Sequence, residues 1–299
     1  MSSVLTIKGI SKNYGQVRAL NNVSFDVPQG SVFGILGPNG SGKTTLLSIL
    51  LDVLKANSGS FLWFGQPGAP EQRKQIGSLL ETPNFYHYLS ALDNLKITQS
   101  ISGRGTKDDI ESVLKKVKLY ERRKSKFSTY SLGMKQRLAI AGALLGSPSV
   151  LLLDEPTNGL DPVGIAEIRE LIVELKNAGH TIIMASHLLD EVEKVCTHMA
   201  ILKTGNLLLT GAVDEIMMDE DVVELSAANL PALAAALQAF RGQVSVDESA
   251  RTVQLILPKG TAKLEDINSH CFSQGIVLNH LLFKKKRLEA RFFELTNNN

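Results

Sequence analysis

The sequence is poor in the features that mark secretion or a structural metal site. Its 299 residues contain two cysteines, Cys196 and Cys271, which lie too far apart for the ligand spacing of a zinc site. Reduced thiols of a cytosolic protein suit this pattern better than a disulfide. No basic segment followed by an apolar run comes after Met1, so a signal peptide is not expected.

Long apolar runs and an excess of charge of one sign are lacking as well. The uncharged stretch 138–153 is interrupted by Gly-Ser-Pro-Ser at 146–149 and is shorter than the roughly 20 residues that a membrane-spanning helix needs. The formal net charge is +2, which gives no electrostatic argument for a nucleic-acid partner. We therefore expect a chain that does not cross a membrane by itself and that binds no nucleic acid.

Strand and helix patterns alternate over about the first 215 residues. A helical pattern covers about 88–146 and another covers 163–177, whereas two of the strands, 150–154 and 181–185, are fully apolar. The strands expected in this part are 3–8, 17–27, 31–36, 61–64, 150–154, 181–185, 200–202 and 207–209. Because apolar strands are buried on both faces, the pattern predicts an α/β core with a parallel sheet.

The pattern changes after the acidic stretch 219–221. Strands and helices are then expected in the order β-α-β-β-α-β, followed by a terminal helix at 284–295. Their ranges are 222–225, 230–240, 243–246, 252–257, 263–272 and 276–281. This order is typical of a split βαβ unit, so we expect a small accessory α+β domain over 220–299.

The strongest functional signal is the glycine-rich stretch 37–44, which matches G-x-x-x-x-G-K-[ST]. It consists of Gly37, Pro38, Asn39, Gly40, Ser41, Gly42, Lys43 and Thr44, and Thr45 comes next. Glycines allow a tight turn whose N–H groups point at phosphate oxygens, Lys43 reaches the β- and γ-phosphates, and the Thr44 hydroxyl can ligate Mg²⁺. A strand before and a helix after the loop would place the phosphates at a helix N-terminus. The motif predicts nucleoside triphosphate binding, and a glycine-rich turn without function is the alternative.

Two adjacent carboxylates, Asp154 and Glu155, end the apolar strand 150–154. Ligands of open α/β sheets bind at the carboxyl ends of the strands. Asp154 is therefore a candidate Mg²⁺ ligand, and Glu155 is a candidate base for the attacking water. The alternative is that the pair only caps a following helix.

A second helix N-terminus with a small hydroxyl residue is expected far along the chain. Ser131 and Gly133 precede the apolar helix 138–145. Such a terminus can bind another anion. Plain N-capping by Ser131 is the alternative.

These motifs, in this order, resemble those of the nucleotide-binding subunit of ATP-binding-cassette (ABC) transporters over about residues 4–215. Tyr14 stands where the family stacks an aromatic ring on adenine, and residues 130–137 stand at the position of the family's signature sequence. The loop 159–162, which contains Asp161, resembles the one that lines the family's dimer interface. His187 resembles the switch histidine that contacts the γ-phosphate.

The resemblance implies ligands, roles and partners. ATP with Mg²⁺ would be bound, and Glu155 and His187 would act in hydrolysis. Ser131 and Gly133 of one copy would face the ATP held by a second copy or a paralogous subunit, together with Asp161. An integral membrane permease would be a further partner, and the chain would lie at the cytoplasmic face of the membrane.

The resemblance also implies a fold. It is a P-loop NTPase of the α/β class, with a RecA-like core, an antiparallel β subdomain and a helical subdomain inserted at about 88–146. This ATP-binding domain would cover 1–215, and the α+β domain would follow it.

Three positions depart from the common family pattern. Glu81 stands where most members carry a glutamine, and it is the third candidate Mg²⁺ ligand beside Thr44 and Asp154. Its carboxylate would be attracted to the metal and repelled by the γ-phosphate. In the signature, Leu132 replaces a glycine and Met134 replaces a glutamine. Both variants resemble the branch that exports drugs, antibiotic peptides or gliding-motility components.

Two other classes of function are weighed against an exporter motor. A soluble ATP-driven clamp of the same superfamily would need a long coiled-coil insertion or a second cassette, and the sequence has neither heptads nor an internal repeat. A weakly active nucleotide-binding scaffold is compatible with the variants at positions 81, 132 and 134.

Overall fold

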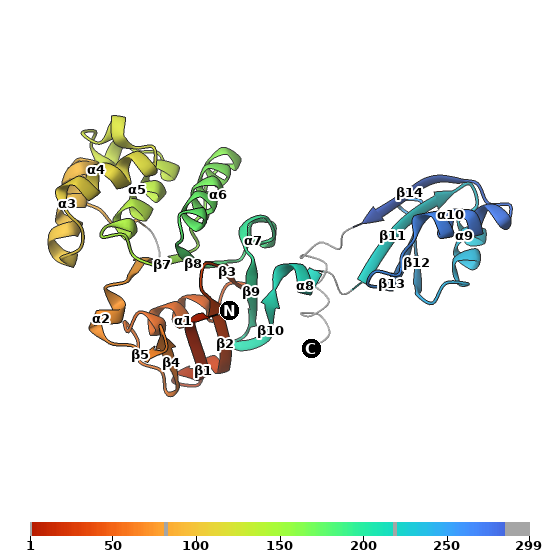
Figure 1. Cartoon of the computed structure of the whole chain (residues 1–299), viewed down its shortest axis with the longest axis horizontal. Coiled ribbons are helices and arrows are strands. Elements are labelled where there is room, and N and C mark those ends of the chain that lie inside the picture. Colours follow the sequence, from red (N-terminus) through yellow and green to blue (C-terminus); the bar gives the residue numbers. More distant parts are fainter. Residues whose placement is uncertain (1, 81–82, 218–219, 285–299) are drawn as a thin grey trace. The chain divides into compact units, whose positions relative to one another are not determined.

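A computed structural model describes residues 2–80, 83–217 and 220–284 (Figure 1). The chain divides into two compact units, Met1–Gly211 and Ala212–Asn299. Each has its own hydrophobic core, so each is described by itself.

A six-stranded sheet forms the centre of the first unit, in the order β10-β9-β3-β8-β7-β6. The strands are β3 (Val32–Leu36), β6 (Ile76–Leu79), β7 (Val150–Asp154), β8 (Thr181–Ser186), β9 (His198–Lys203) and β10 (Asn206–Ala212). All neighbours from β9 to β6 pair in parallel. Every residue of β3, β7 and β8 is buried, which explains why these strands are apolar except at the ends of β7 and β8. The α/β class with a parallel sheet is thereby confirmed.

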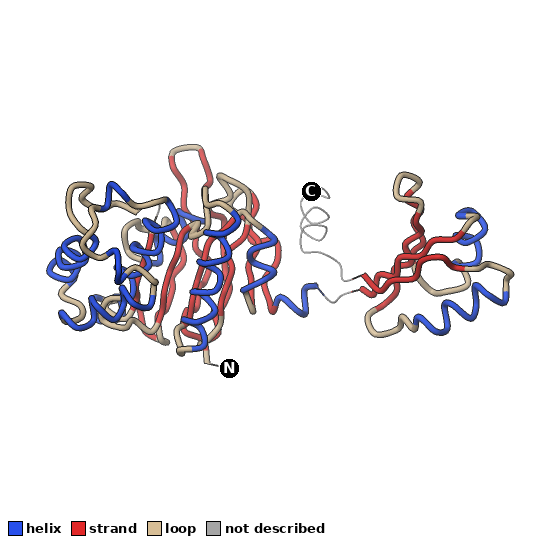
Figure 2. Tube along the Cα trace, turned by 90° about the horizontal axis from the view of Figure 1, so that it is seen from above, coloured by secondary structure: helices blue, strands red, loops and turns tan. Residues whose placement is uncertain are grey.

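An antiparallel sheet packs with the helix that follows the phosphate loop, α1 (Lys43–Leu50). Its strands are β1 (Ser3–Tyr14), β2 (Val17–Pro28), β4 (Ser58–Trp63) and β5 (Gln66–Pro67), in the order β2-β1-β4-β5. The buried Trp63 donates its indole N–H to the Leu50 carbonyl at 3.0 Å, which ties β4 to the end of α1. Figure 2 shows the strands of the first unit running side by side behind their helices.

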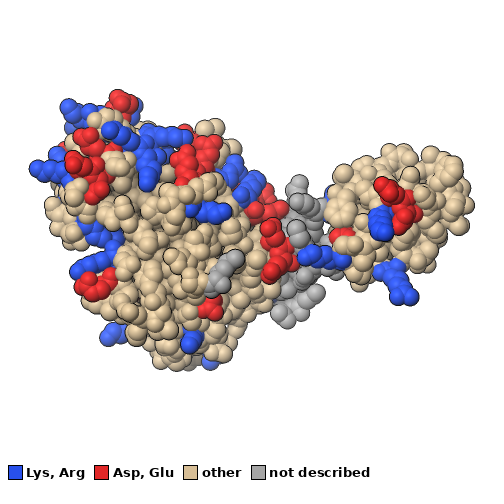
Figure 3. All heavy atoms as spheres, viewed as in Figure 1, with Lys and Arg blue, Asp and Glu red and all other residues tan. Residues whose placement is uncertain are grey.

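Helices inserted between β6 and β7 form a separate group, drawn in yellow tones in Figure 1. They are α3 (Ala91–Ser102), α4 (Lys107–Lys116), α5 (Leu132–Leu144) and the 3₁₀ turns η1 (Tyr120–Arg122) and η2 (Phe127–Thr129). Ser90 caps α3, and a capping box formed by Thr106 and Asp109 begins α4. Basic and acidic side chains are interspersed over this region of the surface (Figure 3).

The remaining elements of the first unit include two that the sequence patterns do not reveal. They are the edge strand β6 and the short helix α7 (Leu189–Val195), which lies beside β3. Helix α2 (Pro70–Arg73) precedes β6, and α6 (Pro162–Asn177) lies between β7 and β8.

Among its described residues, the second unit has α8 (Val213–Met217) at its start, followed by an antiparallel sheet and the helices α9 and α10. Its elements are β11 (Glu220–Ala227), α9 (Leu230–Leu237), β12 (Gln243–Asp247), β13 (Thr252–Pro258), α10 (Leu264–Ser273) and β14 (Leu278–Lys284), with the strand order β12-β13-β11-β14. Apolar residues of β11 and β13 alternate with polar ones and pack against both helices. Strand β14 extends to Lys284, where the sequence predicts the start of a terminal helix. The rest of that predicted helix, 285–295, lies outside the described residues.

Both cysteines are buried free thiols. Burial raises the pKa of the Cys196 thiol well above its ordinary value, so this group is a small apolar residue in practice. Across the parts of the chain that the structure describes, no helix is both long and apolar enough to cross a bilayer.

Candidate nucleotide-binding site

The phosphate loop joins a buried strand to a helix, as its motif predicts. Strand β3 ends at Leu36, and α1 begins at Lys43. The N-cap residue Gly42 has no side chain that could satisfy the first N–H groups of α1, and no acidic residue occupies the first turn. These N–H groups can therefore bind an anion, which the helix dipole also favours.

Gly42 has no room for a side chain. Its φ is +103°, and an added β-carbon would lie 2.4 Å from the Ala19 carbonyl oxygen. We expect Gly42→Ala to lower the free energy of unfolding by about 1–3 kcal/mol and to weaken ATP binding, because the loop must move to relieve the contact. Urea unfolding and nucleotide titration measure the two effects. Gly40→Ala is the control, since Gly40 also has a positive φ but no atom within 4 Å of the added carbon; equal losses in both variants would contradict the steric explanation.

The Lys43 ammonium is buried and is surrounded by oxygen acceptors. It donates to the Gly37 carbonyl at 2.8 Å and to the Pro38 carbonyl at 3.3 Å. Its Nζ also lies 3.4 Å from Glu155 Oε1. Phosphate oxygens are acceptors of the same kind, so Lys43 can exchange these contacts for a triphosphate without losing its partners.

The ends of β7 and β8 bring two further predicted residues to this cluster. Asp154 lies opposite Ala185 in the parallel register, so Glu155 and His187 both follow the carboxyl ends of neighbouring strands. His187 Nδ1 lies 2.8 Å from Glu155 Oε2. Glu155 has φ +46°, a conformation that costs a residue with a β-carbon about 1–3 kcal/mol and that clusters at functional sites. One chain of contacts thus links Lys43, Glu155 and His187.

A cavity of about 430 Å³ lies beside this cluster. Its lining consists of Tyr14, Val17, Arg18, Ala19, Asn39, Gly40, Ser41, Gly42, Lys43, Thr44, Thr45, Glu155 and Thr204. The Tyr14 ring is 47% exposed, and the Lys12 ammonium lies 5.4 Å from its centroid. An exposed ring in the same cavity as the phosphate loop can stack on a nucleotide base.

Two candidate Mg²⁺ ligands lie at the same edge of the sheet. Thr44 is exposed in the cavity, and Asp154 is buried at the end of β7. A hydroxyl and a carboxylate are hard oxygen donors, which Mg²⁺ accepts together with water and phosphate oxygens. The buried Ser41 hydroxyl has no hydrogen-bond partner within the described part of the chain, so the loop keeps a polar group for a ligand. Glu81 lies outside the described residues, and its role as a metal ligand stays a prediction.

The residues of the predicted second anion site do not line this cavity. Ser131 caps α5 by accepting a hydrogen bond from the Met134 N–H at 3.3 Å, so the capping role weighed as its alternative is present. Asp161 caps α6 in the same way, accepting from the Gly164 N–H at 2.9 Å. Ser131 is exposed at its helix end, and its contact with a nucleotide held by another chain stays a prediction.

Four residues of the cavity lining carry no signal in the sequence. Residues 17–19 begin β2, and Thr204 belongs to the turn between β9 and β10. This turn contacts the phosphate loop directly, because the Gly205 N–H donates to the Ser41 carbonyl at 3.0 Å. Only the turn itself could have been recognised, from the Thr-Gly-Asn stretch at 204–206.

A sequence profile described as "ABC transporter" matches residues 20–158. The lantibiotic transport ATP-binding protein SrtF of Streptococcus pyogenes is 41% identical over 211 residues, which are 71% of this chain and 92% of that protein. An uncharacterized ABC transporter ATP-binding protein of Bacillus subtilis, YhcH, is 36% identical over 99% of this chain and 97% of its own length. The bacitracin transport ATP-binding protein BcrA of Bacillus licheniformis is 43% identical over 70% of this chain and 69% of its own length.

Solved structures resemble the first part of the chain. The structure of cbiO1 from Clostridium perfringens, described as part of an ABC transporter complex, has a TM-score of 0.66 at 31% sequence identity. The match covers 72% of this chain and 91% of that one. A nucleotide-free ATP-binding cassette also has a TM-score of 0.66, at 26% identity, over 71% of this chain and 92% of its own.

Proposed function

The chain belongs to the ABC transporter family, in which it is an ATP-binding subunit that hydrolyses ATP, and from this we propose that two copies close around two nucleotides and thereby drive a separate membrane permease. The contact chain from Lys43 through Glu155 to His187 carries the proposal. It joins the ammonium of Lys43, the carboxylate of Glu155 and the imidazole of His187 at the edge of the sheet where ligands of this fold class bind.

The chemistry of this cluster suits phosphoryl transfer to water. ATP binding would bring the Lys43 ammonium onto the phosphates and so break the ion pair between Lys43 and Glu155. The released Glu155 carboxylate could then accept a proton from the attacking water. His187, held against Glu155, would orient that carboxylate and approach the γ-phosphate. Bound Mg²⁺, held by Thr44 and Asp154, would neutralise charge on the phosphate oxygens.

The second copy supplies what one copy lacks. The cavity lining contains the phosphate loop, Tyr14 and Glu155, whereas Ser131 and Asp161 lie at the N-terminal ends of α5 and α6, outside that lining. The exposed Leu132 side chain is 47% accessible at the same helix end. A two-fold dimer would place these helix ends of each copy on the nucleotide of the other.

A groove on the helical insertion suits the permease. Its volume is about 340 Å³, and its lining is formed by Asn84, Phe85, Tyr86, Asn94, Ile97, Thr98 and Ile101. Ile101 is 82% exposed and Tyr86 is 49% exposed, so the groove presents apolar and aromatic surface that a partner protein could cover. Closure of the dimer would then move this groove together with any permease loop seated in it.

The groove gives a direct test of the permease proposal. We expect Ile101→Asp to reduce recovery of the chain with solubilised membranes at least about tenfold, because it places a charge beside the apolar side chains that line the groove. ATP binding by the purified chain should not change. Val53→Asp is the control, since Val53 is 66% exposed outside the groove lining. Equal membrane recovery of both variants would contradict docking at this groove.

The names of two relatives suggest the cargo. SrtF and BcrA are named for transport of a lantibiotic and of bacitracin. We therefore propose an antibiotic peptide as the cargo. From the family resemblance of the signature sequence we further propose export as the direction and the cytoplasmic face of the membrane as the place where this subunit works.

A further inference from the structure

Helices α5 and α6 touch at successive levels along their lengths. At their first turns, a β-carbon added to Gly133 would lie 4.0 Å from the Gly164 Cα. One turn further on, Arg137 Nη2 lies 3.4 Å from Glu167 Oε2. The two contacts are four residues apart on α5 and three residues apart on α6, which is about one helical turn on each helix. Both contacts therefore lie on the faces that the two helices turn toward each other.

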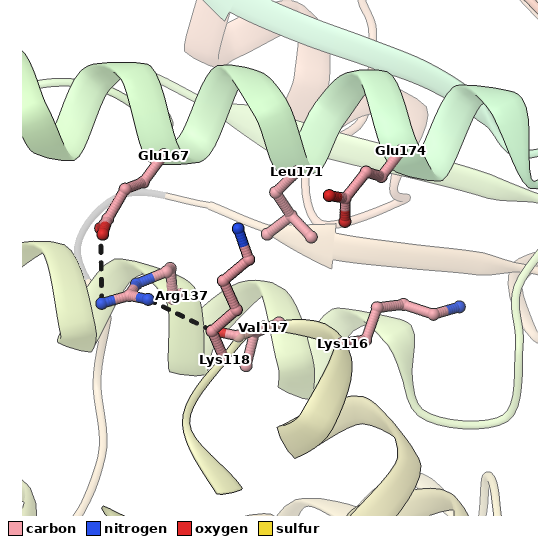
Figure 4. A pocket seen from close by; sticks show the side chains of 7 residues that line it. All are labelled: Lys116, Val117, Lys118, Arg137, Glu167, Leu171 and Glu174. Carbon is pink, nitrogen blue, oxygen red and sulfur yellow. Dashed lines mark hydrogen bonds and ion pairs between the residues drawn. The ribbon is translucent and has the colours of Figure 1, made fainter.

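Arg137 lies at the junction of three helices (Figure 4). It projects from α5 toward Glu167 on α6, and its Nη1 donates to the carbonyl of Val117, the residue that ends α4, at 3.4 Å. Its side chain is only 13% exposed, and that of Glu167 is 40% exposed. Because a planar guanidinium bonds in two fixed directions, this residue can fix the angle between the helical insertion and α6.

A second ion pair between the same two regions is much more exposed. Lys118 Nζ lies 3.6 Å from Glu170 Oε2, and the two side chains are 60% and 65% exposed. Solvent-exposed ion pairs of this kind contribute little to the stability of a contact. The sheltered ion pair, Arg137–Glu167, therefore has a solvent-exposed counterpart, Lys118–Glu170, about one helical turn away on α6.

The sheltered contact lies between the two helices whose N-caps are Ser131 and Asp161. We propose that Arg137 and Glu167 are positioning residues, and that their ion pair sets the angle at which α5 presents Ser131 to the nucleotide of the partner copy. This inference rests on the dimer proposed above. Without the pair, the close approach of Gly133 to Gly164 remains as a pivot about which α5 can turn.

The test uses the full chain carrying Glu155→Gln, so that ATP is bound without turnover. We expect Glu167→Gln to raise the dissociation constant of the ATP-bound dimer by roughly 3- to 30-fold, while the affinity of the monomer for ATP is unchanged. Arg137→Gln should have a similar effect, and the double variant should be no worse than the more affected single variant. Glu170→Gln is the control and should leave dimerisation unchanged. Analytical ultracentrifugation with and without ATP gives the constants.

Hydrogen exchange in the nucleotide-free monomer separates the two proposals. Loss of the pair should increase exchange of the N–H groups of residues 134–136, which are bonded within the first turn of α5, in Glu167→Gln and not in Glu170→Gln. Unchanged exchange, or additive effects of the two single variants on dimerisation, would overturn the positioning role. If Glu155→Gln alone fails to dimerise with ATP while exchange responds as expected, the dimer proposal fails and the contact between Arg137 and Glu167 still positions α5.

Discussion

Glu155→Gln should lower the turnover of ATP by roughly 10²–10⁴-fold while leaving ATP binding intact. Glutamine has nearly the same shape and can keep the hydrogen bond to His187, but it cannot accept the proton of the attacking water. The substitution also removes the negative charge that lies 3.4 Å from Lys43. Steady-state phosphate release and ATP titration of the same preparation measure the two properties.

Loss of the Glu155 charge should also affect the affinity for ATP. A triphosphate must displace Glu155 from Lys43, so ATP should bind the variant at least as tightly as the parent chain. Glu121→Gln is a suitable control, because Glu121 is an exposed carboxylate of the helical insertion. Turnover equal to that of the control would contradict the role of Glu155 as the base, and weaker ATP binding would contradict the displacement.

The sequence predicts those parts of the site that depend on local chemistry. The phosphate loop is recognisable because its glycines, Lys43 and Thr44 are required at fixed spacing, and because the apolar β3 must precede it. Asp154 and Glu155 are recognisable because they follow an apolar run that is typical of a buried strand. Two carboxylates at that point must lie at the carboxyl edge of the sheet, where ligands bind. The long helices and the buried strands follow from periodicity in the same way.

Other parts depend on contacts between distant segments and leave little trace in the sequence. Strand β6 is hidden because Gly77 interrupts a short apolar run; the glycine is required since an added β-carbon would lie 2.0 Å from the Ala143 carbonyl oxygen of α5. Thr204 enters the cavity only because its turn packs on the phosphate loop. The pairing of Arg137 with Glu167 likewise joins residues that are separated by a strand and two loops.

Lys43→Ala should abolish measurable hydrolysis and weaken ATP binding by roughly 10²-fold or more, because charge-assisted bonds to two phosphates are lost together. The variant also leaves Glu155 without its ammonium partner beside the phosphates, which adds repulsion. Titration with ATP and phosphate release measure both losses. Lys12→Ala is the control, since Lys12 lies near the Tyr14 ring and donates to the Lys55 carbonyl but does not belong to the cavity lining.

Mixing this variant with a second one tests whether each site is shared between two copies. In the Glu155→Gln background, neither Lys43→Ala nor Ser131→Arg should trap nucleotide by itself, because each of the two sites in such a homodimer lacks one half. A mixed dimer has one site with an intact Lys43 from one copy and an intact Ser131 from the other, while its second site carries both lesions. Mixed dimers isolated with two different tags should therefore hold one nucleotide, against two in the unmodified Glu155→Gln dimer. If mixing traps no nucleotide although the parent dimer traps two, Lys43 and Ser131 do not act on the same ATP. The exposed hydroxyl of Ser131 would then be only the cap of α5 that its hydrogen bond to Met134 already makes it.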